Sequence, residues 1–224
     1  VAVRGRFRPV TNIFSDMLKK GVAQFEQEPD VDDDKICILS ELTLRNLEDG
    51  TNQIDEKDFL DRVDILCSIG QTVLISNFHE YFKLVAYLSQ FTKLRMALIM
   101  GMPNLEYIFD ETHYKDLPGG IISAFASLFG QKIKLYLYPT LNEQGEIIHL
   151  ETFETEPHLA GLLTYLKDNE KLEDIQKYDE KLMTIRTDNV LGMIQNGMGD
   201  WEKMVPASVA KQIKENHLFG YANH

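Results

Sequence analysis

The spacing of apolar residues changes period within residues 71–101, and this stretch organises the rest of the chain. Residues 71–76 (Gln-Thr-Val-Leu-Ile-Ser) form a short apolar run, as a buried strand does. Residues 77–91 then place an apolar side chain at every third or fourth position, which is typical of a helix. Residues 94–100 (Leu-Arg-Met-Ala-Leu-Ile-Met) return to an apolar run. The pattern predicts a βαβ unit: two neighbouring parallel strands, buried on both faces, with the helix crossing over one face.

The same reasoning predicts the remaining elements. Further strands are expected at residues 1–8, 35–43, 132–138 and 146–153, and helices at 11–25, 55–69, after Pro103, and at 121–129, 157–166, 179–194 and 206–218. A hairpin turn is expected at residues 142–145, and no strand beyond residue 154. The predicted fold class is therefore α/β, a parallel sheet of about five strands flanked by helices, with a helical C-terminal extension. Part of a (β/α) barrel is the alternative, because successive βα units without a Gly-rich dinucleotide turn suit either fold.

The segments before and after Glu154 differ, because strands and helices are expected before it and helices alone after it. We therefore place a domain boundary near Glu154. Residues 1–154 are expected to form an α/β, nucleotide-binding-like domain, and residues 155–224 a helical extension packed on it. The helices of the extension are short and each needs an apolar surface elsewhere, so the extension should not be stable alone. The chain begins at Val1 and enters strand-like sequence at once, which indicates a piece of a longer protein.

Composition narrows the classes of partner. The 224 residues are 44% apolar, enough for a sizeable core, and the net charge of −12 argues against nucleic acid or an anionic membrane as the main partner. No apolar run is long enough for a membrane span, and no signal peptide is evident. Cys37 and Cys67 lie among apolar neighbours without a C-x-x-C motif, so we expect two buried thiols and a reducing, cytoplasmic compartment.

Two acidic stretches resemble calcium-binding loops but depart from the pattern. In residues 30–41, Lys35 occupies the position that needs glycine, and in residues 49–58 the alignment puts Leu47 where the first aspartate belongs. Both are expected to be solvated acidic loops, and we predict no metal site.

The segment Gly5-Arg-Phe-Arg-Pro9 ends the first predicted strand and leads into a helix. This motif resembles the first motif of the nucleotidylyltransferases, in which two following histidines stabilise the triphosphate. Here Thr11 and Phe14 stand at those positions. The best match to the family's second signature is Ile75-Ser76-Asn77-Phe78, which lacks the arginine that should follow at a fixed spacing. An ordinary junction between a strand and a helix is the alternative interpretation.

A wider resemblance covers nearly the whole chain. It is carried by Asp58-Phe-Leu-Asp-Arg-Val-Asp64, Thr72-Val-Leu-Ile-Ser-Asn77, Pro118-Gly-Gly120 with Leu128-Phe129, Lys134-Leu-Tyr-Leu-Tyr-Pro139 and Trp201-Glu-Lys-Met-Val-Pro206. Together these segments resemble the C-terminal part of longer bacterial proteins that are labelled nicotinate- or nicotinamide-nucleotide adenylyltransferases. The resemblance implies a nucleotide-binding protein that joins ATP to a mononucleotide, with Mg²⁺ accompanying ATP. Because Thr11 and Phe14 replace the two histidines, we expect weak or no activity from this chain.

Candidate ligand-binding residues lie after the predicted strands, where open parallel sheets bind ligands. Arg4, Arg6 and Arg8 alternate along the first strand, so they should share one face and contact phosphate. The candidates for ligand binding are Arg6, Arg8, Asn12, Arg45, Asn77 and His79. No catalytic residue can be assigned. His79 beside Glu80 could form an acid–base pair, although adjacent residues on a helix point in different directions.

Two functions from different classes therefore remain open. The first is a nucleotidyltransferase-like enzyme that handles a small nucleotide. The second is a non-catalytic ligand-binding or assembly module on an α/β scaffold. Trp201 is expected to anchor the C-terminal helices on the sheet or in a dimer, so a homo-oligomer is compatible with either function.

Overall fold

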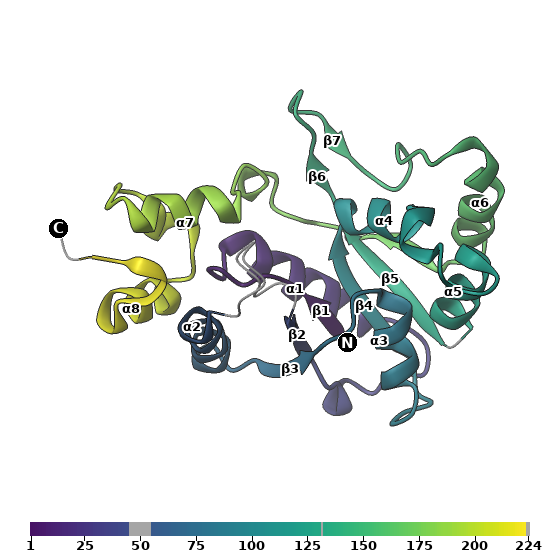
Figure 1. The fold of residues 1–224 in the computed structure, drawn as a ribbon, viewed down its shortest axis with the longest axis horizontal. Helices are drawn as coiled ribbons and strands as arrows, with labels where there is room; N and C mark the ends of the chain where they lie inside the picture. Colours follow the sequence, from purple (N-terminus) through teal and green to yellow (C-terminus); the bar gives the residue numbers. More distant parts are fainter. Residues whose placement is uncertain (45–54, 131, 223–224) are drawn as a thin grey trace. The chain divides into compact units, whose positions relative to one another are not determined.

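A six-stranded parallel sheet flanked by helices forms the fold in the computed structural model, which describes residues 1–44, 55–130 and 132–222 (Figure 1). The sheet comprises β1 (Ala2–Arg4), β2 (Leu39–Thr43), β3 (Thr72–Ser76), β4 (Met96–Gly101), β5 (Ile133–Tyr138) and β8 (Leu172–Asp174), in the order β3-β2-β1-β4-β5-β8. A separate hairpin contains β6 (Thr140–Leu141) and β7 (Ile147–Ile148), as predicted. The α/β fold class is confirmed. The strands do not follow one another in chain order, as they would in a barrel, so the barrel alternative is wrong.

The helices mostly match their predicted positions but are shorter. They are α1 (Asn12–Phe25), α2 (Glu56–Ser68), α3 (Tyr81–Leu88), α4 (Met102–Phe109), α5 (Gly120–Phe129), α6 (Ala160–Asp168), α7 (Thr187–Gln195) and α8 (Ala207–Asn216). At the start of α2, the Asp55 carboxylate accepts the backbone N–H of Asp58 at 3.0 Å. After this helix, Gly70 takes the left-handed φ of 78° that a C-terminal glycine supplies. None of the helices within the described ranges combines the length and apolar character needed to cross a bilayer.

The prediction that residues 71–76 and 94–100 form neighbouring strands is wrong. β3 pairs with β2, with Ile75 opposite Leu42, whereas β4 pairs with β5, with Ile99 opposite Tyr136. β3 is an edge strand and is not buried on both faces, because only Ser76 in it is buried and the Ile75 side chain is 49% exposed. A short apolar run marks a strand, but it does not distinguish a central strand from an edge strand.

A second correction concerns the segment after residue 154, where no strand was predicted. β8 runs parallel to β5, with Leu172 opposite Leu135. It has only three residues, two of them acidic, and Leu172 alone is buried; short, charged edge strands are common because they resist pairing with another chain. Its Leu-Glu-Asp sequence therefore carries no alternation that could be recognised.

Both cysteines are exposed, which corrects the expectation of buried thiols. Cys37 precedes β2, and Cys67 lies on α2 outside the buried stripe of that helix. The stripe consists of Asp58, Asp61, Arg62, Ile65 and Leu66, so it includes three charged residues that an apolar pattern does not reveal.

The chain groups into two compact units. Unit 1 comprises residues 1–2, 20–37 and 78–178, and unit 2 comprises residues 3–19, 38–77 and 179–224. Residues 155–178 thus belong to the first unit and residues 179–224 to the second. Whether residues 155–224 act as a dependent extension is a question of stability, so the boundary near Glu154 stays a prediction.

Each unit has its own packed interior. In unit 1, every residue of β5 and all of β4 except its last residue, Gly101, are buried. In unit 2, apolar side chains from α2, α7 and α8 surround Trp201, which is 3% exposed. Trp201 therefore holds α7 and α8 together with α2 in the core of unit 2.

Candidate functional site

The loop that follows β1 carries the Gly5–Pro9 motif. The strand ends at Arg4, and Phe7 then adopts a left-handed backbone with φ of 51°, which is rare for a bulky residue. The Phe7 ring is buried and packs edge-on against Phe14, with ring centroids 5.0 Å apart. A Cβ atom on Gly5 would lie 2.9 Å from that ring, so glycine is needed where the ring folds back over the strand end. The glycine and phenylalanine of the motif thus serve packing.

Arg4, the residue before the motif, differs from the two arginines within it. Its guanidinium forms a bidentate pair with Glu41, with Nε–Oε2 at 2.5 Å and Nη2–Oε1 at 3.0 Å. Ser76 donates its hydroxyl to the same carboxylate, and the Glu41 side chain is fully buried. The Arg4 side chain is only 9% exposed and neutralises the buried carboxylate of Glu41, so the two residues form a structural ion pair. The expectation that Arg4, Arg6 and Arg8 share one face is wrong, because the strand stops before the alternation can continue.

Arg8 belongs to a partly buried ionic cluster on α2. Its Nε lies 2.5 Å from Oδ1 of Asp58, and the other oxygen of that carboxylate pairs with Arg62. Arg62 also donates from Nη1 to the backbone carbonyl of Arg6 at 3.3 Å, which ties the loop to the helix. Burial lowers the pKa of the Arg62 guanidinium from its ordinary value, and the positive charges of Arg8 and Arg6 act in the same direction, although Asp58 opposes the change.

Arg6 lies at the exposed side of this cluster. Its Nη1 donates to Oδ1 of Asp188 at 3.0 Å, and both side chains are largely exposed. The arginine cluster therefore contains Arg6, Arg8 and Arg62 with Asp58 and Asp188. Among the described residues, these three guanidinium groups pair with two carboxylates, in a chain whose net charge is −12.

The other predicted site residues are not brought into the arginine cluster by any contact the structure records. Asn12 begins α1 and donates its side-chain amide to the backbone carbonyl of Lys203 at 2.9 Å. Arg45 lies outside the described residues. Asn77 is exposed after β3, in unit 2, whereas His79 belongs to unit 1. The neighbour of His79, Glu80, forms an ion pair with Lys83 at 2.8 Å, so its carboxylate is engaged elsewhere.

Thr11 and Phe14, which stand where the resembling family has histidines, are used for packing. Thr11 is 1% exposed, and its backbone carbonyl accepts the N–H of Ser15 at 3.1 Å. Phe14 is partly buried against the core of unit 2 and contacts Phe7. Neither side chain can supply positive charge to a phosphate.

Sequence reasoning missed three members of the arginine cluster: Asp58, Arg62 and Asp188. Asp58 and Arg62 have the i,i+4 spacing of a helical ion pair, and that signal could have found them. Asp188 is distant in sequence from Arg6 and carries no such signal.

Within residues 1–44, 55–130 and 132–222, no three or more His, Cys, Asp or Glu side chains come close enough together to hold an ion.

Comparison with known proteins adds no assignment: neither a protein-family model nor a protein of curated function matches this sequence.

Proposed function

We propose that this chain binds the phosphate group of a small nucleotide at the loop after β1, and that it performs little or no adenylyl transfer. The observation that carries the proposal is the position of two solvent-accessible arginines, Arg6 and Arg8, directly after β1. In open α/β sheets, ligands bind outside the carboxyl ends of strands near the point where the strand order reverses. The order β3-β2-β1-β4-β5-β8 reverses at β1, and the cluster lies directly after that strand.

Arg8 is the residue best placed to contact a phosphate. Its side chain is 35% exposed, so solvent and ligands reach it. If Arg8 turns toward a phosphate, the buried Asp58 keeps Arg62 as a partner and no carboxylate is left stranded. Arg6 is more exposed still and would add a second contact, whereas Arg4 stays with Glu41.

The absence of cationic side chains at Thr11 and Phe14 argues against efficient catalysis. Transfer of an adenylyl group needs positive charge where negative charge develops on the phosphates. Since the described residues form no cage for a resident ion, Mg²⁺ would enter with ATP, held mainly by its phosphates. Membership of the adenylyltransferase-like family and a cytoplasmic location, where ATP is abundant, are part of this proposal.

Calorimetric titration of the whole chain with ATP–Mg²⁺ tests the binding step. We expect weak binding that Arg8→Ala reduces at least about tenfold, because a charge-assisted hydrogen bond contributes roughly 1.5–3 kcal/mol. Lys211→Ala is the matched control: it removes one positive charge from an exposed position on α8 of the same unit. Equal affinities of Arg8→Ala and the unmodified chain would place the site elsewhere.

A turnover assay with ATP and nicotinate mononucleotide tests the catalytic step separately. We expect dinucleotide formation that is slight or undetectable. Rapid turnover would overturn the argument from Thr11 and Phe14, even if ATP binds at the expected loop.

An assembly role is the second candidate, and the edge of the sheet in unit 2 favours it. Among the described residues, β3 pairs with another strand on one side only, and the large apolar side chains of Ile75 on β3 and Leu60 on α2 are 49% and 56% exposed. Edge strands with exposed apolar residues are ready to pair with another chain. Sedimentation analysis would show a concentration-dependent dimer that Ile75→Lys disrupts. A monomer at all concentrations would exclude self-assembly.

A further inference from the structure

The C-terminal end of α7 carries the one asparagine of the chain that precedes a glycine, Asn196 before Gly197. Asn196 is the C-cap of the helix, and its Nδ2 donates to the backbone carbonyl of Gly192 at 2.7 Å. Gly197 then adopts a left-handed backbone with φ of 63°, as many helices show at this position. Residues 195–200 are all exposed, so burial does little to hold this turn closed.

An asparagine in such a turn can react with its own backbone. The nitrogen of the following residue attacks the side-chain carbonyl carbon, Cγ. A bond forms between this nitrogen and Cγ, the bond from Cγ to the amide nitrogen breaks, and ammonia leaves with the proton of the attacking N–H. Water then opens the resulting cyclic imide at either carbonyl, which gives aspartate or isoaspartate. Glycine as the following residue favours the attack, because it has no Cβ to obstruct the nitrogen and its backbone rotates freely.

A second turn has nearly the same geometry but lacks the glycine. Asn169 is the C-cap of α6 with φ −97° and ψ 15°, against −96° and 6° at Asn196, and its Nδ2 donates to the Tyr165 carbonyl at 2.8 Å. Glu170 follows with φ of 52°, and its N–H donates to the Lys167 carbonyl at 3.0 Å. The chain then enters β8, which pairs with β5. The α6 turn therefore provides a natural comparison, with a bulky following residue and an exit held by the sheet.

The attack at Asn196 requires its turn to open. At a ψ of 6°, the Gly197 nitrogen lies beside the backbone nitrogen of Asn196 and away from its side chain. Rotation toward Cγ breaks the hydrogen bonds from Gly197 N to the Ile194 carbonyl at 3.4 Å and from Met198 N to the Met193 carbonyl at 2.9 Å. The first of these is longer than its counterpart in the α6 turn, so the attacking N–H is weakly held. Exposed turns at helix ends open at a low cost in free energy.

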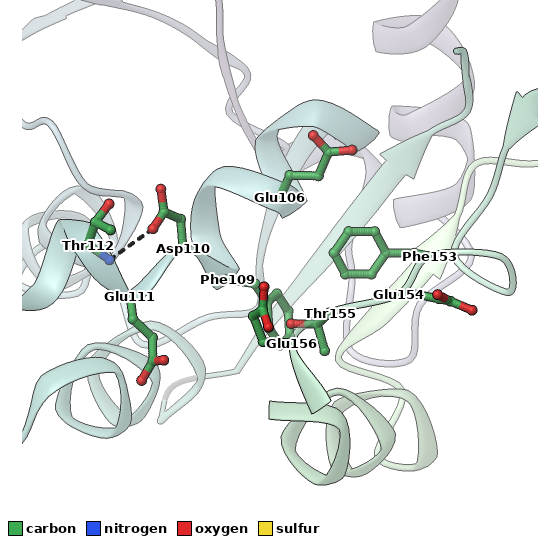
Figure 2. A pocket seen from close by; sticks show the side chains of 9 residues that line it. All are labelled: Glu106, Phe109, Asp110, Glu111, Thr112, Phe153, Glu154, Thr155 and Glu156. Atoms are coloured by element: carbon green, nitrogen blue, oxygen red, sulfur yellow. Dashed lines mark hydrogen bonds between the residues drawn. The ribbon is translucent and has the colours of Figure 1, made fainter. Parts of the chain in front are cut away.

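From this exposed and weakly bonded Asn-Gly turn, we propose that Asn196 is a site of spontaneous deamidation and that the product loosens the end of α7. The new carboxylate has no N–H to donate to the Gly192 carbonyl, and it faces the negative end of the helix dipole. Asp110 shows the opposite arrangement: as the N-cap of the 3₁₀ helix Glu111–Tyr114, its carboxylate accepts the N–H of Thr112 at 2.9 Å (Figure 2). A carboxylate is favourable at that end of a helix and unfavourable at the end that Asn196 occupies.

The test is incubation of the whole chain at neutral and mildly alkaline pH, followed by proteolysis and mass spectrometry. We expect Asn196 to lose its amide several times faster than Asn169, and faster at the higher pH, because attack requires the Gly197 nitrogen to give up its proton. Part of the product should be isoaspartate, which forms only through the cyclic imide. Equal rates at the two asparagines, or aspartate without isoaspartate, would overturn the proposal.

The variant Glu170→Gly separates the effect of the glycine from that of the open turn. It gives Asn169 the same following residue at a position that already has a positive φ. In the folded chain, Asn169 of this variant should still react more slowly than Asn196, because β8 holds its turn. In urea, where neither turn is formed, the two Asn-Gly pairs should react at the same rate. Equal rates in the folded chain would overturn the part played by the open turn of α7.

Thermal melts test the consequence for α7. The melting temperature of the unmodified chain should fall during incubation, whereas that of Asn196→Gln should stay constant. Asn196→Asp should melt at a lower temperature than the unmodified chain, and Asn189→Asp, which adds the same charge in the first turn of the same helix, should not. An equal fall of Asn196→Gln during incubation, or equal losses in the two aspartate variants, would overturn the effect on the helix end.

Discussion

At the scale of the residue, Gly21 shows how closely helix α1 approaches the sheet inside unit 1. A Cβ atom at this position would lie 2.6 Å from Cδ1 of Ile99, a residue of β4 that is 1% exposed. From sequence alone, a glycine inside a helix is a weak point, because alanine favours the helix by about 1 kcal/mol. Here the glycine permits contact between helix and strand. We therefore predict that Gly21→Ala destabilises the chain by about 1–3 kcal/mol through overpacking, as urea unfolding would measure.

Gly192→Ala provides the matched control, since no atom lies within 4 Å of a Cβ built at this helical position. Without a clash, the intrinsic preference of alanine for helix should dominate, and stability should rise by about 0.5–1 kcal/mol. A stabilising effect at both glycines would show that the backbone of α1 moves freely away from β4.

Asp174, the last residue of β8, offers a prediction about pH. Burial raises the pKa of its carboxyl above the ordinary value of 3.8, although the carboxylate accepts the N–H of Leu150 at 3.0 Å. The native state thus binds this proton more readily than the unfolded state, so stability falls as pH rises through the raised pKa. Asp174→Asn keeps an acceptor for Leu150 and carries no charge. We expect it to be more stable than the unmodified chain at pH 7, by less than about 1 kcal/mol.

Thermal melts of both chains at several pH values would check this prediction. The advantage of Asp174→Asn should vanish below about pH 3.8, where the aspartate is protonated in either state. A constant difference at every pH would mean that geometry at Leu150, and not the charge, controls the effect.

Single residues also show how far sequence could identify the candidate site. Arg6 and Arg8 were recognised from a short motif, and both lie in the arginine cluster. The carboxylates that hold them were missed, because a buried charge on a helix looks like any solvated charge until its partner is known. Phe7 could not be assigned a left-handed backbone from its residue type, and this backbone is what ends the alternation of the arginines.

At the scale of elements, the acidic loop after α1 is joined to β5 by a buried ionic network. The Glu28 carboxylate pairs with Lys134 and accepts the hydroxyl of Tyr136 at 2.7 Å, while Arg95 lies 3.1 Å from its other oxygen. Lys134 also pairs with Glu173 of β8 at 2.8 Å. The stretch predicted to be a solvated loop begins at Asp30 and is exposed at residues 32–34, whereas Glu28, two residues before it, has a side chain that is only 10% exposed.

We predict that Glu28→Gln costs about 1–3 kcal/mol at pH 7, because it leaves Arg95 with a neutral partner and Lys134 with Glu173 as its one remaining carboxylate in the network. Burial by itself would raise the pKa of Glu28, but Lys134, Tyr136 and Arg95 together bring it below the ordinary value of 4.5. The stabilisation is therefore fully present above pH 4.5 and is lost as the pH falls through the lowered value. Urea unfolding at pH 7 and pH 3 should show the difference shrinking in acid.

The control for this network is Glu26→Gln, an exposed glutamate two residues away, which should change stability by less than about 0.5 kcal/mol. A cost for Glu28→Gln that persists in full at pH 3 would contradict an ionic origin.

Most elements could be predicted from periodicity, but their arrangement could not. α1, α2, α5 and β5 have clear patterns, and the structure places them close to the expected residues. The pairing of β3 with β2 depends on tertiary packing, and the local sequence of either strand does not show which partner it pairs with. β8 is the extreme case, since its three residues become a strand only because β5 offers a free edge.

At the scale of the whole molecule, the two compact units are interleaved along the chain. The chain passes between them five times, so neither unit corresponds to one continuous segment. Sequence patterns are interpreted along the chain, which favours domains made of one continuous segment. The change near Glu154 from mixed strands and helices to helices alone therefore predicts a single domain boundary. The interleaving means that a C-terminal fragment takes residues from both interiors at once.

The last prediction follows from this arrangement: residues 156–224 expressed alone will not fold. Residues 156–178 would lack β5, to which β8 pairs, and residues 179–224 would lack the α2 side chains that pack in one core with Trp201. Short helices without an apolar partner surface are marginal in water. Circular dichroism should therefore show a fragment with little helix and no cooperative melt, whereas Trp201→Ala in the whole chain should cost about 3–5 kcal/mol. A monomeric fragment that melts cooperatively would show that the C-terminal segment carries a sufficient core of its own.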